Sequence, residues 1–175
     1  QIDDLSPLAG CTDLTFLSLQ ENQISDLSAL SGFTDLTVLY LDLNQVSDLS
    51  PLSGLADLTF LGLQLNRVSD LSPLSGLTGL EVLYLSANQI SDVAPLSGLA
   101  GLKWLYLAGN QINDLSPLSG LTSLRYLDLQ QNEVSDIEPL VANTGLGSGD
   151  DVKLTFNPLN LMSVNTWIPA LQARG

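Results

Sequence analysis

Seven aspartates recur along the chain at intervals of 22 residues, and carboxylate oxygens are ligands that Ca²⁺ prefers in proteins. They are Asp4, Asp26, Asp48, Asp70, Asp92, Asp114 and Asp136. Each precedes a short turn segment such as Ser50-Pro51-Leu52, where a carboxylate can accept backbone N–H groups one or two residues further on. No segment has the Gly-Asp-rich loops of calcium-binding repeats. We therefore expect this Asp column to cap turns, and we expect neither a metal site nor a cofactor.

Six asparagines recur with the same 22-residue spacing. They are Asn22, Asn44, Asn66, Asn88, Asn110 and Asn132. A buried amide at the end of a strand can bond backbone groups of its own coil and of the neighbouring coil. Because buried polar groups are normally paired, we interpret this Asn column as a structural ladder and not as a ligand site.

The chain lacks the residues on which many catalytic sites depend. It has no histidine, which removes Ser-His-Asp and Cys-His arrangements together with the usual proton shuttle. The single cysteine, Cys11, excludes a disulfide within the chain. Cys11 occupies the repeat position that Phe33 and Leu55 occupy in later units. We therefore expect it to be a small buried hydrophobic residue and not a reactive thiol.

The charge balance excludes further classes of function. Nineteen acidic residues stand against five basic ones, and the net charge is −14. Binding to nucleic acid or to an anionic membrane surface needs clustered Lys and Arg, so both are disfavoured. No apolar run approaches the length of a membrane span, and we therefore expect no membrane insertion.

The elements that position these columns share the 22-residue period. Leu14–Asn22 follows the plan L-x-x-L-x-L-x-x-N, which recurs five more times up to Leu124–Asn132. Leu17 and Leu19 point to one side of a short strand, and Phe16 to the other. One unit cannot bury its leucines alone, so stacked units should form a parallel sheet over a continuous core, with Leu17 and its equivalents buried. Strands should begin near Phe16, Val38, Phe60, Val82, Trp104 and Tyr126.

The segment that returns the chain from one strand to the next is too short for a full helix with two loops. A brief 3₁₀ turn fits better, with the proline where a first-turn N–H would be unpaired anyway. A looser seventh unit, with a strand expected over 152–157, ends at Asn157, 25 residues after Asn132.

Over about residues 2 to 160 these units resemble the leucine-rich repeats of bacterial, internalin-like proteins. The resemblance implies a mostly β, α/β solenoid: a right-handed horseshoe with a concave parallel sheet and short 3₁₀ turns on the convex face. It also implies protein recognition, and an extracellular or cell-surface location.

We expect residues 1–175 to form a single leucine-rich-repeat domain and to be a fragment of a longer protein. A partial repeat covers 1–9, full repeats cover about 10–141, and an irregular last repeat with a C-terminal cap covers 142–175. Trp167, Ile168 and Leu171 are expected in a capping helix, with Pro169 in its first turn or at a kink.

Aromatic side chains dominate the strand positions that face away from the core. The third position of the pattern reads Phe16, Val38, Phe60, Val82, Trp104, Tyr126, and the fifth reads Ser18, Tyr40, Gly62, Tyr84, Tyr106, Asp128. Exposed aromatics in a contiguous stripe mark a contact site. Alternatively, ring stacking along the sheet only stabilises strand pairing. Lys103 and Arg125 lie beside these aromatics, and aromatics with Arg are typical of interface hot spots.

We therefore predict a module that binds a protein partner on its concave aromatic face, and not an enzyme. The predicted contact residues are Tyr40, Phe60, Tyr84, Lys103, Trp104, Tyr106, Arg125, Tyr126 and Asp128. Lys103 and Arg125 would steer an acidic partner. A carbohydrate-binding surface, on which sugars stack against the rings, and a structural spacer are the alternatives. Paired carboxylates could serve a glycosidase, but an open sheet offers no cleft for one.

Overall fold

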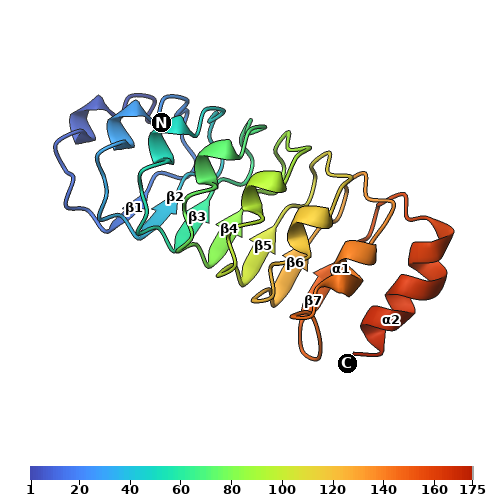
Figure 1. Ribbon diagram of the computed structural model, residues 1–175. Helices are drawn as coiled ribbons and strands as arrows, with labels where there is room; N and C mark the ends of the chain where they lie inside the picture. The colour runs from blue at the N-terminus through green and yellow to red at the C-terminus, as the bar shows by residue number, and fades with distance from the viewer. Residues whose placement is uncertain (175) are drawn as a thin grey trace.

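In the computed structural model, which describes residues 1–174, the 22-residue units stack into one elongated solenoid (Figure 1). Seven three-residue strands form a single parallel sheet in sequence order. They are β1 (Phe16–Ser18), β2 (Val38–Tyr40), β3 (Phe60–Gly62), β4 (Val82–Tyr84), β5 (Trp104–Tyr106), β6 (Tyr126–Asp128) and β7 (Asp151–Lys153). The expected starts of the first six strands are confirmed. The last strand begins one residue earlier than expected and ends at Lys153, because its pairing with β6 is as short as the other pairings.

Short turns line the side of the solenoid opposite the sheet (Figure 1). Six are 3₁₀ turns: Ser6–Leu8, Ser28–Leu30, Ser50–Leu52, Ser72–Leu74, Ala94–Leu96 and Ser116–Leu118. Five of the six have proline in the first turn, where no backbone N–H is needed. In the last full repeat a short α-helix, α1 (Glu138–Ala142), takes the place of the 3₁₀ turn.

Leucines from the strands and the turns form one continuous core between the two sides. Equivalent leucines lie directly opposite one another, as in the pairs Leu39–Leu61 and Leu61–Leu83. These and the equivalent Leu105 are fully buried. Leu17 was expected to be buried too but is only partly so, because β1 is the first strand and has a neighbour on one side alone.

The expectation that Cys11 is buried is wrong. Its thiol is free and the residue is exposed, whereas Phe33 and Leu55 at the equivalent positions are completely buried. The reason is position in the stack: the coil that contains Cys11 has no full coil before it, so the side that would be covered elsewhere faces solvent.

A helical segment closes the C-terminal end (Figure 1). A π-helical turn, Ser163–Trp167, continues into α2 (Ile168–Gln172), and Pro169 lies in the first turn of α2. Trp167, Ile168 and Leu171 pack, partly buried, against the core. In the part of the chain that the structure describes, every helix is too short or too polar to cross a membrane.

Candidate functional site

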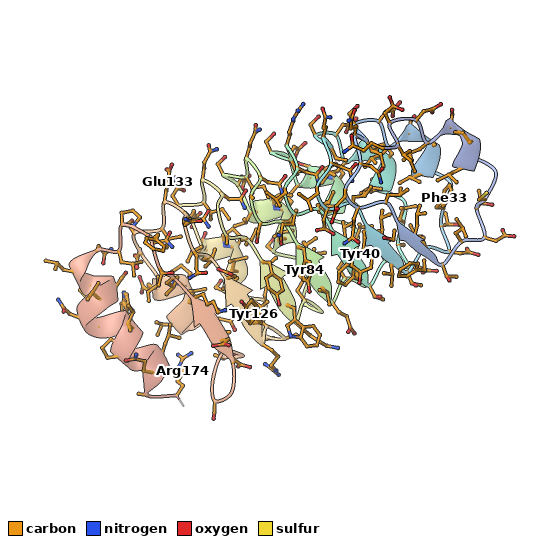
Figure 2. All side chains as sticks on the ribbon, turned by 180° about the vertical axis from the view of Figure 1, so that it is seen from behind. Phe33, Tyr40, Tyr84, Tyr126, Glu133 and Arg174 are labelled. Atoms are coloured by element: carbon orange, nitrogen blue, oxygen red, sulfur yellow. The ribbon has the colours of Figure 1, made fainter. Side chains whose placement is uncertain are left out.

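Six aromatic rings make one continuous row along the exposed face of the sheet, which we call the aromatic row. Its members are Phe16, Tyr40, Phe60, Tyr84, Tyr106 and Tyr126. Neighbouring centroids are 4.4 to 5.9 Å apart, within the range for favourable ring pairs. Figure 2 labels three of them, and all three project from the strands on the same side of the sheet. This pairing supports the interpretation that ring contacts stabilise the sheet.

Trp104 differs from the aromatic row. It starts β5 opposite Val82 on one side and Tyr126 on the other, yet it takes part in none of the ring pairs found among residues 1–174. The residue is 40 % exposed, whereas the rings from Tyr40 to Tyr126 are half-buried. Its indole is therefore the ring at the centre of this face that is most available to a partner.

The aromatic row also changes the pKa of one of its members, Tyr106. Burial raises the pKa of Tyr106, and the neighbouring Tyr84 and Tyr126 raise it further. The hydroxyl of Tyr106 therefore stays neutral at physiological pH and remains a hydrogen-bond donor.

The basic residues expected to steer a partner are each paired with an acid. The Lys103 ammonium lies 2.8 Å from the Glu81 carboxylate, and the Arg125 guanidinium lies 3.7 Å from Asp150. Arg125 also donates to the backbone oxygen of Leu124. These acids offset much of the positive field, so any steering by the two side chains acts at short range.

Lys153, which the sequence-based prediction missed, extends the aromatic row at its C-terminal end. It lies opposite Asp128 in the sheet, and its ammonium is 5.0 Å from the centre of the Tyr126 ring. A hydrogen bond to Tyr126 raises the pKa of Lys153. The signal was present, because Lys153 takes the fifth position of the irregular last repeat.

Asp42 is a second missed residue, and it occupies a gap in the aromatic face. Its carboxylate accepts from the side-chain amide of Gln20 (3.1 Å) and from the backbone N–H of Gln64 (2.9 Å), and the residue is 8 % exposed. A Cβ built on Gly62 would lie 2.5 Å from a carboxylate oxygen of Asp42. The carboxylate therefore fills the space that a fifth-position side chain would take. The signal in the sequence was Gly62, which interrupts the Tyr40–Tyr84 column.

The Asn column lies at the edge of the sheet and links consecutive coils. The amide of Asn66 donates to the carbonyl oxygens of Leu41 (2.9 Å) and Leu63 (3.1 Å), and its oxygen accepts from Val46 N–H (2.9 Å). Asn110 and Asn132 are buried, whereas the four earlier members are half-buried. Asn157 continues the column into the last repeat, where it donates to Leu129 and Leu154.

The Asp column lies at the start of the turns. Each carboxylate accepts the backbone N–H two residues on, at 2.7 to 2.9 Å. Within residues 1–174 no three metal-ligating side chains come together. The Ser50 hydroxyl and backbone lower the pKa of Asp48, and Ser6 and Ser72 do the same for Asp4 and Asp70.

These lowered pKa values predict a loss of stability in acid. The hydrogen bonds at the turns favour the ionised carboxylate. Their contribution to the free energy of unfolding is therefore complete above the ordinary Asp pKa of 3.8, and it disappears as pH falls through the lower folded-state pKa. The urea midpoint should therefore drop progressively as pH falls below the ordinary Asp value of 3.8. In a chain with Asp48→Asn and Asp70→Asn the drop should be smaller, because asparagine keeps the acceptor without titrating. An equal drop in both chains would contradict this role of the column.

The comparison with protein families agrees with the geometry. A family model described as "Leucine Rich repeats (2 copies)" matches residues 12–54, 56–98 and 101–142, which is more than half of the chain. The chain belongs to the leucine-rich-repeat family. Its open parallel sheet and 3₁₀ turns are those of a leucine-rich-repeat horseshoe with the sheet on the concave face.

Solved structures relate this leucine-rich-repeat chain to internalins, as its repeats predicted. An internalin of Listeria monocytogenes (InlF) is 34 % identical with a TM-score of 0.90, over 97 % of this chain and 49 % of that one. Internalin C2 of the same species is 31 % identical with a TM-score of 0.66, over 90 % and 79 %. The plant peptide hormone receptor RGFR1, solved in complex with RGF2, is 25 % identical with a TM-score of 0.74, over 87 % and 26 %. The leucine-rich-repeat chain thus spans about half the length of the first internalin. None of the curated proteins compared with it matches.

Proposed function

We propose that the chain binds a protein partner on the concave face of its sheet, centred on Tyr84, Trp104, Tyr106 and Tyr126. The observation that carries this proposal is Trp104, a large ring 40 % exposed beside a row of half-buried tyrosines. A central exposed tryptophan surrounded by tyrosines has the composition of an interface hot spot. The surrounding rings hold their positions through mutual contacts, so little side-chain entropy would be lost on binding.

The architecture supports this assignment. Seven strands at a spacing of about 4.8 Å give a surface roughly 30 Å long, which suits a protein-sized partner. Stacked repeats typically use such extended concave surfaces for binding. The plant receptor, a structural neighbour with the same repeats, was solved in complex with RGF2. The internalin neighbours favour an extracellular or cell-surface setting for the chain.

Replacing Lys103 with glutamate tests whether the partner is a protein. The change turns the attraction between residue 103 and Glu81 into repulsion and makes this part of the face acidic. An acidic protein partner should associate several-fold more slowly at low salt, with little change in its dissociation rate. The rates are measured by surface plasmon resonance at two salt concentrations.

Lys103→Gln is the matched control and should have a smaller effect, because it removes the charge without reversing it. A neutral sugar would bind both variants and the parent chain equally. Equal rates for a protein partner in all three chains would remove Lys103 from the interface.

A further inference from the structure

Asp42 is a mostly buried carboxylate on the proposed binding face without a cationic partner among residues 1–174. The two ion pairs in that part of the chain use Glu81 and Asp150. An ionised carboxylate offers about four acceptor positions. Asp42 uses two of them, one on each oxygen, for the bonds from Gln20 and Gln64. The Asp42 carboxylate therefore keeps unused acceptor positions, although the residue is only 8 % exposed.

Gly62 determines where that charge lies. Residue 62 stands between Tyr40 and Tyr84 in the sheet register, and both tyrosines project onto the exposed face (Figure 2). Any side chain at residue 62 would displace the carboxylate, since its Cβ would lie 2.5 Å from the nearer oxygen of Asp42. Because residue 62 is a glycine, the carboxylate of Asp42, which lies two residues beyond Tyr40, can occupy a position on the aromatic face.

Aromatic residues flank Gly62, the residue that the Asp42 carboxylate approaches, because Tyr40 and Tyr84 lie opposite it in the two neighbouring strands. The Phe60 ring is 4.4 Å from Tyr40 and 5.1 Å from Tyr84, centre to centre. Ring faces attract cations and also accommodate the methylene stem of a long basic side chain. A carboxylate at a gap in an aromatic row is chemically suited to an ammonium or guanidinium group on an apolar stem. A metal ion would need more oxygen ligands than this site provides.

We propose that Asp42, at the gap left by Gly62, binds a lysine or arginine side chain of the protein partner. The inference rests on the proposed function and adds a specificity-determining contact to it. The basic residue would meet the early strands, whereas the acidic surface expected opposite Lys103 would meet the later ones. The contact would lie at Gly62 on β3, two strands away from Trp104 on β5. The partner would then present a basic residue to the early strands and its main apolar contact to the later ones.

The test uses two peptides and the ¹⁵N-labelled chain. The first peptide is acetyl-Gly-Lys-Gly-amide, and the second has norleucine in place of lysine, which keeps the stem and removes the ammonium. We expect saturable shifts of the Gly62 and Gln64 amide signals with the lysine peptide alone. Asp42→Asn should weaken this binding at least about tenfold, because a charge-assisted bond is lost while an oxygen remains for the Gln64 N–H. Gly62→Ala should weaken it similarly by displacing the carboxylate.

Asp48→Asn is the matched control, since it removes an exposed carboxylate of the Asp column and should leave the peptide affinity unchanged. Equal shifts with the norleucine peptide, undiminished binding to Asp42→Asn, or no saturable shift at all would each overturn the inference. The proposed function has a separate readout, which is the effect of Trp104→Ala on a protein partner. If that effect is present and the lysine peptide does not bind, only the Asp42 contact is wrong.

Discussion

Replacing Trp104 with alanine should weaken binding of the protein partner by about 2 kcal/mol or more, roughly 30-fold in Kd. The ring is 40 % exposed and makes no ring pair with the aromatic row, so its loss removes contact area from the interface and not from the leucine core. The free energy of unfolding should therefore stay nearly constant. Calorimetric titration of the partner and urea denaturation measure the two quantities on the same sample.

Phe16→Ala is the control for the Trp104 variant. Phe16 is 56 % exposed and lies at the end of the aromatic row, so the variant loses an aromatic ring away from the proposed centre. It should change the affinity much less than Trp104→Ala. If Trp104→Ala instead unfolds the domain while its folded fraction still binds the partner, the ring is part of the packing and the binding surface lies elsewhere.

Replacing Asn66 with alanine should lower the free energy of unfolding by about 1–3 kcal/mol. The variant leaves the carbonyl oxygens of Leu41 and Leu63 and the N–H of Val46 without their partner in the middle of the solenoid. The urea midpoint reports the change. Gln89→Ala, an exposed amide that makes no side-chain hydrogen bond among residues 1–174, should leave the midpoint in place. An unchanged midpoint for Asn66→Ala would remove the structural role of the Asn column.

The repeat pattern predicts the interior well because each interior position has the same surroundings in every repeat. Leu61 meets the equivalent leucine on both sides, so the strand alternation alone determines its burial. The same reasoning fails at the first repeat. Leu17 is only partly buried and Cys11 is exposed, since the pattern assumes a neighbouring coil that the first position lacks.

The proposed binding face is harder to predict, because it depends on contacts between columns and not within them. Tyr84 and Tyr106 lie in one column and in ring contact, yet Trp104, also on the face, stands apart from the ring pairs. The pairing of Lys103 with Glu81 depends on how two flexible side chains extend between strands. Asp42 reaches from its own column into the one that contains Gly62. The glycine marks the gap in the sequence, but the pattern does not indicate which neighbouring side chain fills it.

The order of the strands has an evolutionary consequence. Each strand pairs only with the strands before and after it in the sequence, and each repeat rests only on its neighbours. A duplicated or deleted 22-residue unit would therefore need no new kind of contact and would lengthen or shorten the face by about 4.8 Å. If the face binds a partner as proposed, the size of the partner that fits would be set by how many copies of the unit the gene contains. The chemistry of the partner's surface would be set by the few outward side chains of each copy. Selection could therefore alter the size and the chemistry of the partner independently.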